Sequence, residues 1–368
     1  MIWNSVGESG KETHKIGNKL QRPYPQNVSF PCDVSAGRSQ VRPTSVHKLK
    51  AGDIDVVAGL GDSLMCNNGA AASNNFQVVR ENRGLSWAAG GQGTWREFTT
   101  FPNIIKVYNP ALQGYAIYDG FTVHNTSKLN LGEPGALSID MLYSAQVLLR
   151  RMQDDPNIDV QKHWKVITIM IGANDMCSHL CYERNPESYP ELHRRNLIKA
   201  LKYIKNNIPR SFVNIVAVPP INLLTGFRHQ PPICWAWHLV ECSCFFGSRV
   251  EKQQPRYINI LKRWVAVEKE VSALPEFQDK EDFAVVFQPF TTEIEIPKNS
   301  NGLEDLSYLS VDCFHLSQKA NALAGVALFN NMFQPIGQKD TNWKPYYDNF
   351  PCPPKANPYI KTHLNSNK

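Results

Sequence analysis

Short motifs spread along most of the chain hold side chains that together could perform acyl transfer. Gly-Asp-Ser at 61–63 supplies a hydroxyl, and "VDCFHLS" supplies Asp312 and His315. "IGAND" adds Asn174 and Asp175. Acyl transfer needs a nucleophile, an imidazole that takes its proton, a carboxylate that orients the imidazole, and donors to an oxyanion. These residue types supply each of those groups.

The elements that must position these residues alternate between two patterns. Short apolar runs predict buried strands in "DIDVVAGL", "GLSWAAGG", "WKVITIMIG", "FVNIVAVPP" and "FAVVFQPF". Apolar residues at helical spacing predict helices over 137–153, 191–208 and 255–274, and a last helix that follows Ser317 as its N-cap. This alternation predicts an α/β protein, a three-layer α/β/α sandwich with a mainly parallel sheet. Such sheets bind ligands at the carboxyl ends of their strands, where the motifs lie.

Each of these residues also has an ordinary interpretation. Ser63 could cap a helix, and His315 could be a surface or core histidine. Asn174, Asp175 and Asp312 could cap turns, and the glycines of "GGQGTW" could form a flexible turn. Their joint occurrence after predicted strands favours a catalytic site over five unrelated structural roles.

"GDSL", "GGQGTW", "GAND" and "DCFH", in this order, resemble the four sequence blocks of the GDSL, or SGNH, hydrolase family. The longer flanks resemble the catalytic repeats of the phospholipase B branch of that family, from about residue 45 to residue 352. The resemblance implies a flavodoxin-like SGNH hydrolase fold that uses no metal and no organic cofactor. It also implies that Ser63 attacks the ester and that His315 is the base. Asp312 is the favoured orienting carboxylate, with Asp175 as the alternative.

The resemblance further implies the oxyanion donors, which would be the backbone N–H groups of Ser63 and Gly91 and the side-chain amide of Asn174. The expected substrates are the acyl esters of phospholipids and lysophospholipids, cleaved through an acyl-enzyme on Ser63 at a lipid interface. Two alternatives stay open: an esterase on small soluble or carbohydrate acyl esters, and an inactive relative that binds lipid or glycan.

Nine cysteines are many for a cytosolic protein, and the close sets "CSHLC" and "CWAWHLVECSC" predict disulfide-tied loops with at least one cysteine left unpaired. Two glycosylation sequons, at Asn27 and Asn125, fit the same context. We therefore expect an extracellular or cell-surface protein whose leader is absent from this chain. A zinc site at Cys234, His238, Cys242 and Cys244 is a weaker alternative. Cys66 is either a buried small residue or a thiol near the pocket that alkylating agents could reach.

Aromatic residues accompany the second cysteine set and predict either core packing or a disulfide-stapled flap that meets lipid. They are Phe227, Trp235, Trp237, Phe245 and Phe246.

The bulk composition bounds the remaining possibilities. The 368 residues have a net charge of +6, but the charges are scattered, which argues against nucleic-acid binding. The sequence lacks an apolar run long enough to span a membrane. We expect a monomer with an extended arm at 1–50, a catalytic domain at 51–333 and an irregular, proline-rich tail at 334–368.

Overall fold

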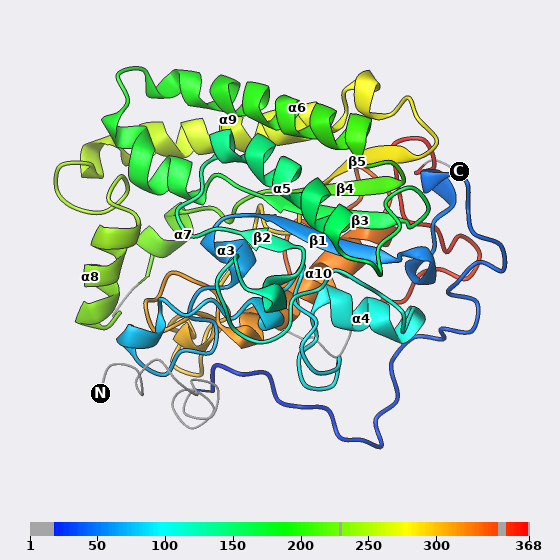
Figure 1. The fold of residues 1–368 in the computed structure, drawn as a ribbon. Helices are drawn as coiled ribbons and strands as arrows, with labels where there is room; N and C mark the ends of the chain where they lie inside the picture. Colours follow the sequence, from blue (N-terminus) through cyan, green and yellow to red (C-terminus); the bar gives the residue numbers. More distant parts are fainter. Residues whose placement is uncertain (1–17, 228–229, 345–350, 367–368) are drawn as a thin grey trace.

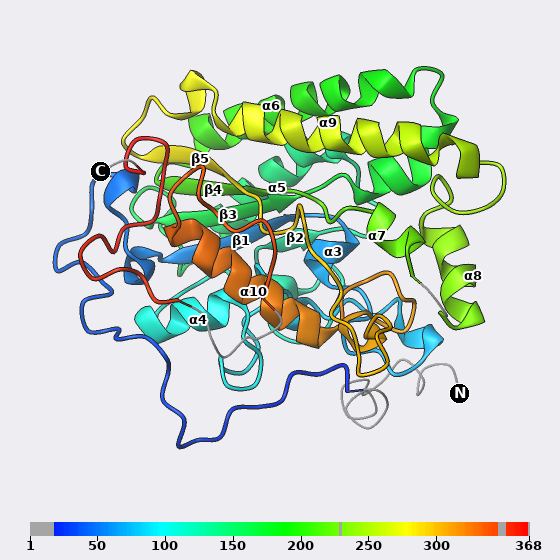
Figure 2. The same ribbon diagram turned by 180° about the vertical axis from the view of Figure 1, so that it is seen from behind.

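Five parallel strands in the order β2-β1-β3-β4-β5 form the centre of the molecule (Figures 1 and 2). The computed structural model describes residues 18–227, 230–344 and 351–366. The strands are β1 (Val56–Gly61), β2 (Asn130–Gly132), β3 (Lys165–Met170), β4 (Ser211–Val216) and β5 (Phe283–Gln288). Their side chains are buried on both faces, which explains why the strand sequences are nearly continuous apolar runs.

Helices cover both faces of this sheet (Figures 1 and 2). One face packs against α5 (Met141–Asp154), α6 (Tyr189–Asn207) and α9 (Gln254–Ser272). The other face packs against α4 (Phe101–Tyr108) and α10 (Gln318–Phe333). The predicted α/β/α sandwich is confirmed, and its two apolar cores lie on the two sides of the sheet.

Three shorter helices lie at the end of the sheet where the strands finish (Figure 1). They are α3 (Ser63–Cys66), which follows β1, α7 (Asn222–Thr225), which follows β4, and α8 (Pro232–Glu241). The turn after β3 is a π-helical segment, Asp175–His179. The motifs with Ser63 and with Asn174 and Asp175 are therefore at the edge where α/β sheets bind ligands.

The four long helices predicted from the sequence are confirmed as α5, α6, α9 and α10, with small shifts at their ends. The Ser317 hydroxyl accepts from Ala320 N–H and caps α10, as predicted. Almost every residue of α10 is buried, because α4 and the N-terminal arm cover the side that faces away from the sheet.

The strand predicted at "GLSWAAGG", residues 84–91, is wrong. This segment folds into short turns, in which Leu85 N–H donates to Asn82 O and Gly90 N–H donates to Ser86 O. Trp87 N–H donates to the Asn321 side chain on α10, so the segment covers the helix layer. The second strand of the chain is instead β2, which pairs with β1 and whose three residues are too few to give a recognisable apolar run.

The described parts of the N-terminal arm and the C-terminal tail lie against the same domain and against each other. Cys32 forms a disulfide with Cys352, and Ile360 N–H donates to Leu49 O. The expected arm and tail extend over residues 1–17, 345–350 and 367–368, which lie outside the described residues. None of the helices that the structure describes combines the length and apolar character that a bilayer span requires.

Candidate active site

Ser63 is the first residue of α3, directly beyond the carboxyl end of β1. The N-cap of this helix is Asp62, whose carboxylate accepts from Leu64 N–H at 3.0 Å. The alternative that Ser63 serves as the helix cap is therefore wrong, and capping does not occupy its hydroxyl. As the first helical residue, Ser63 also has a backbone N–H with no intrahelical acceptor. Burial raises the pKa of Asp62 to about 6, although Leu64 N–H and the charge of His315 oppose the shift.

His315 and Asp312 form a buried pair within one turn of the chain. The distance from His315 Nδ1 to Asp312 Oδ2 is 2.6 Å, and the other Asp312 oxygen accepts from Phe314 N–H and His315 N–H. Burial acts to lower the pKa of His315, but the charge and hydrogen bond of Asp312 outweigh it, and the pKa is raised. Burial also acts to raise the pKa of Asp312, but the charge and hydrogen bond of the imidazole outweigh it, and the pKa is lowered. The remaining ring nitrogen, Nε2, is buried and has no hydrogen-bond partner in the described structure.

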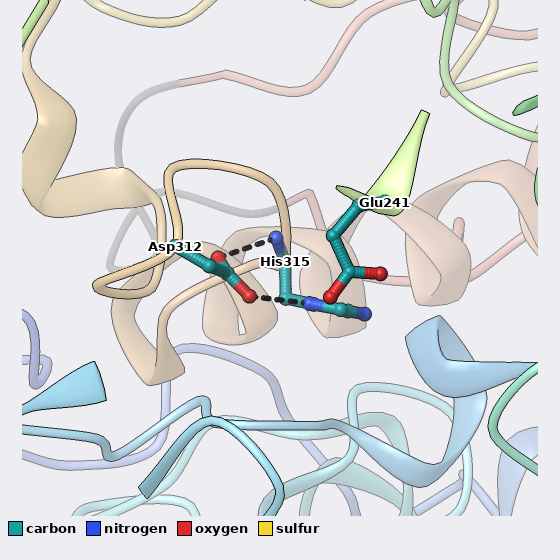
Figure 3. Close-up of side chains that lie close together, drawn as sticks. All are labelled: Glu241, Asp312 and His315. Atoms are coloured by element: carbon teal, nitrogen blue, oxygen red, sulfur yellow. Dashed lines mark hydrogen bonds and ion pairs between the residues drawn. The ribbon is translucent and has the colours of Figure 1, made fainter. Parts of the chain in front are cut away.

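A third acidic residue, Glu241 at the end of α8, lies beside this pair (Figure 3). A carboxylate oxygen of Glu241, a carboxylate oxygen of Asp312 and a ring nitrogen of His315 all lie within 4.8 Å of one another. Burial raises the pKa of Glu241, partly offset by the charge of His315. Glu241 was not predicted from the sequence, because only the disulfide between Cys234, near the start of α8, and Cys313 would have linked α8 to the histidine turn.

Asn174 and Asp175, which follow β3, face a different part of the site. The Asn174 amide donates to Ala136 O at 3.0 Å, which leaves its second N–H free of that bond. The buried Asp175 carboxylate accepts from Ser138 N–H at 2.9 Å. Burial raises its pKa to about 7, against the opposing hydrogen bonds from Ser138. Thus Asp312, and not Asp175, hydrogen-bonds to the His315 ring.

The structure contradicts the predicted oxyanion role of Gly91. Its N–H already donates to Ala116 O at 2.8 Å, and an added Cβ would collide with the Tyr115 ring, so this glycine serves packing. The glycine that follows the true second strand is Gly135, with φ +80°. Nothing lies within 4 Å of the position a Cβ would take, and its N–H has no acceptor among the described residues. Gly135 was not predicted from the sequence, because the second strand was expected at residues 84–91 and not at 130–132.

An apolar cavity lies between the segments that contain Ser63, Asn174 and His315. Direct neighbours of all three line it: Leu64, Ala173, and Phe314 with Leu316. Its other lining residues are Pro219, Pro220, Ile221, Leu223, Leu224, Ile294, Ile296 and Leu309. The cavity has almost no polar surface, so a hydrocarbon group would fit it better than a sugar would.

The segments after β1 and before α10 also contact one another directly. Ser310 Oγ donates to Gly69 O at 2.6 Å, and Gln318 N–H donates to Ala70 O at 2.8 Å. These bonds hold the Ser63 segment against the His315 segment, as a shared site requires. No hydrogen bond joins the Ser63 hydroxyl to His315 in the described structure, and such contacts often tighten only when substrate binds.

Eight of the nine cysteines form disulfides, which confirms the predicted disulfide-tied loops and one unpaired cysteine. The two close sets pair with each other through Cys177–Cys242 and Cys181–Cys244, and Cys234 pairs with Cys313. A zinc site at 234–244 is therefore wrong, because its three thiols are consumed. Disulfides of this number are typical of proteins from oxidising compartments.

The free cysteine is Cys66, which is fully buried on α3. Its thiol lies 2.9 Å from Asn68 Oδ1, and burial raises the pKa of Cys66 well above its usual range. These features fit the interpretation of Cys66 as a buried small residue. They disfavour an accessible reactive thiol, because reagents attack the thiolate.

The aromatic residues near α8 divide between the core and the surface. Phe245 is fully buried, whereas the Trp235 side chain is 53% exposed. Trp237 is half-buried and donates from Nε1 to Asn75 Oδ1 at 3.0 Å. With Ile233 and Val240, also exposed, Trp235 gives α8 an apolar outer surface.

The fold and these motifs define a class of ester hydrolases. The profile of the family described as "GDSL-like Lipase/Acylhydrolase" matches residues 57–328, most of the chain, and the chain belongs to this family. The match includes Ser63, Asn174, Asp312 and His315.

Among curated proteins, the chain is similar to the membrane-associated phospholipase B1 of rat and human. It is 36% identical to the rat protein over 343 residues, 92% of this chain, and 36% identical to the human protein over 334 residues, 89% of this chain. The chain spans only 23% of the length of each of these relatives.

Among solved structures, the chain is similar to an extracellular lipase from Streptomyces rimosus and to phospholipase A1 from Streptomyces albidoflavus. The first is 14% identical, with a TM-score of 0.36, over 72% of this chain and 94% of that one. The second is 14% identical, with a TM-score of 0.37, over 74% and 96% of the two chains.

Proposed function

We propose that this protein hydrolyses the acyl esters of phospholipids and lysophospholipids. The observation that supports this most strongly is the buried Asp312–His315 pair. The Nε2 atom of His315 has no partner in the described structure, and both sequence neighbours of His315 line an apolar cavity. The cavity wall includes the immediate neighbours of Ser63, Asn174 and His315, so a fatty acyl chain there would have its ester close to all three. The phospholipase B1 similarity supports the same class of substrate.

In the proposed reaction, His315 Nε2 takes the Ser63 proton while Ser63 Oγ attacks the ester carbonyl. Asp312 holds the Nδ1 proton and so fixes the tautomer that leaves Nε2 as the acceptor. The imidazolium then protonates the departing alcohol, leaving an acyl-enzyme on Ser63. Water, activated by His315 in the same way, releases the fatty acid and restores the Ser63 hydroxyl.

The oxyanion donors proposed here are the Ser63 backbone N–H, the free N–H of the Asn174 amide and the Gly135 backbone N–H. We propose Gly135 in place of Gly91, because the Gly135 N–H has no acceptor among the described residues. Gly135 also follows β2, the strand next to β1. The bond from Asn174 to Ala136 O places the two loops next to each other. Each donor of this kind lowers the barrier by about 2.7–4 kcal/mol.

The outer surface of α8 supports a lipid interface as the place of reaction. Ile233, Trp235 and Val240 are exposed there, and an indole ring is well suited to the boundary between water and hydrocarbon. The Cys234–Cys313 disulfide ties this helix to the histidine turn, so docking of α8 would bring the site to the lipid. The four disulfides also support an extracellular or cell-surface location.

We further propose that residues 51–333 form the catalytic unit, with the arm and tail as its covering segments, and that the protein acts as a monomer. All groups of the proposed site come from one chain, which supports the monomer.

Comparing phospholipid hydrolysis by the wild type with that by Ser63→Ala tests the function. The wild type should release fatty acid from mixed micelles and react covalently with a fluorophosphonate probe, whereas Ser63→Ala should do neither. A wild type that prefers dispersed acetyl esters over long-chain micellar substrates would instead be a soluble esterase. A folded wild type that neither reacts with the probe nor hydrolyses any ester would be an inactive binding relative.

A further inference from the structure

Glu241 approaches the histidine turn from a different part of the chain than Asp312 does. Asp312 belongs to the turn that contains His315, whereas Glu241 is the last residue of α8 (Figure 3). The Glu241 carboxylate extends toward the His315 ring, and a carboxylate oxygen of each acid lies within 4.8 Å of a ring nitrogen of His315. The imidazole therefore has two carboxylates next to it.

Two disulfides fix the helix that positions Glu241. Cys234 near the start of α8 is bonded to Cys313, two residues before His315. Cys242, directly after Glu241, is bonded to Cys177 in the turn after β3. The backbone of Glu241 is thus held between the two segments that contribute His315 and Asn174, which limits how far the carboxylate can move from the imidazole.

The half-buried Glu241 carboxylate has neither a hydrogen bond nor an ion pair with another residue of the described structure. The other charged groups that face the histidine are Asp312 on its own turn and Asp62 before α3. The charge of Lys19, in the N-terminal arm, also interacts with that of Asp312. Glu241 is the only one of these acids in the described structure that comes from α8.

We propose that Glu241 is a positioning residue of the His315 site, which stabilises the imidazolium form of His315 through its negative charge. This inference rests on the proposed ester hydrolysis. When His315 takes the Ser63 proton, a positive charge develops on the ring, and a second carboxylate within 4.8 Å lowers the energy of that state. The base becomes stronger as a result, and the rate at neutral pH rises.

The sign of the pH effect follows from the same charge. His315 must be neutral to accept a proton, so the acid limb of kcat/KM reports its pKa. A carboxylate raises the pKa of a nearby histidine, and loss of Glu241 should lower it. A variant without the Glu241 carboxylate should therefore stay active at lower pH than the wild type, but its maximal rate should be lower.

The variant Glu241→Gln removes the charge and keeps the shape. We expect its acid limb to move down by about one pH unit and its plateau kcat to fall about three- to tenfold, with little change in KM. Glu241→Asp, which keeps the charge, should return the acid limb toward that of the wild type. Glu251→Gln is the matched control, because this nearby glutamate is exposed, and its profile should equal that of the wild type.

A direct NMR titration of the His315 ring in wild type and Glu241→Gln separates this inference from the proposed function. A lower His315 pKa in the variant supports the coupling even if no ester is cleaved, in which case the proposed function alone fails. An active wild type whose acid limb and His315 pKa are both unchanged in Glu241→Gln overturns the inference and leaves the function intact. If Glu241→Gln is unfolded by near-ultraviolet circular dichroism, Glu241→Ala, which also removes the charge, decides by the same criterion.

Discussion

Asp312 Oδ2 and His315 Nδ1 are 2.6 Å apart, and both residues belong to one turn of the chain. The other Asp312 oxygen accepts two backbone N–H groups from that turn, so the carboxylate is held by its own loop before any substrate arrives. Because Asp312 is fully buried, its charge acts on the imidazole with little screening by water. A pair assembled from residues three apart needs no long-range packing to reach the right geometry.

The first prediction separates the two acids that the sequence offered as partners of the histidine. Asp312→Asn should lower kcat by about 10⁴-fold, because the ring loses the partner that sets its tautomer. Asp175→Asn should lower kcat much less, because Asp175 bonds to Ser138 N–H. Steady-state kinetics on a lysophospholipid would measure both effects. A large loss in Asp175→Asn alone, with a normal melting temperature, would reverse the assignment.

The second prediction concerns the oxyanion donors. Asn174→Ala should lower kcat about 10²- to 10³-fold with a small change in KM, as expected for a donor that acts mainly in the transition state. Gly135→Ala should lower kcat about tenfold or more, because alanine disfavours φ +80° by about 1–2 kcal/mol and the loop must shift.

Gly337→Ala is the control for the strain at Gly135. Gly337 has φ +88° and equally open surroundings, but it follows α10 at the far end from the histidine turn. Its variant should match Gly135→Ala in stability and match the wild type in kcat. Equal kcat values for both glycine variants would remove Gly135 from the site.

The third prediction tests whether the apolar cavity holds the acyl chain. Leu223→Trp should fill part of the cavity and exclude about two methylene groups of a long chain. At about 0.8 kcal/mol for each methylene, the ratio of kcat/KM for sixteen-carbon over eight-carbon lysophospholipids should fall about tenfold. Leu192→Trp, on the surface of α6, should leave the ratio unchanged. An unaltered ratio in Leu223→Trp would place the acyl chain elsewhere.

The fourth prediction concerns Cys66. Its thiol is buried and its pKa is raised, so iodoacetamide at neutral pH should leave the native wild type and Cys66→Ala equally active. Mass spectrometry should find one alkylated cysteine only after the protein is unfolded without reductant. Rapid inactivation of the wild type, with Cys66→Ala protected, would show that the thiol is accessible.

Much of the fold was predictable from the sequence because the patterns are strong. Strands β1, β3, β4 and β5 are buried on both faces, and the long helices have apolar residues at regular spacing. The short strand β2 was not predictable, since three residues do not establish a period. Because the second strand was expected at residues 84–91, the oxyanion glycine was expected at Gly91. The loop that follows β2 contains Gly135 instead.

Within the site, local relationships were predictable and long-range ones were not. Asp312 was favoured over Asp175 because it lies three residues from His315, and the hydrogen bond follows that spacing. Glu241 is 74 residues from His315 in the sequence, and only the folded α8 and its disulfides bring the two together. Neither the residue type of Glu241 nor its position in the sequence indicates that it lies next to His315.

The Cys32–Cys352 disulfide joins residues 320 positions apart and closes nearly the whole domain into a covalent ring. A pulling force applied to the flanking polypeptide on both sides would pass from one segment to the other through this bond. The described residues outside the ring, 18–31 and 353–366, also hydrogen-bond to the domain, for example at Lys19 and Lys361, so these contacts would part first. After that, the sheet inside the ring would be shielded from the load. A protein tethered between a surface and a moving object would then keep its sheet folded until the sulfur–sulfur bond broke.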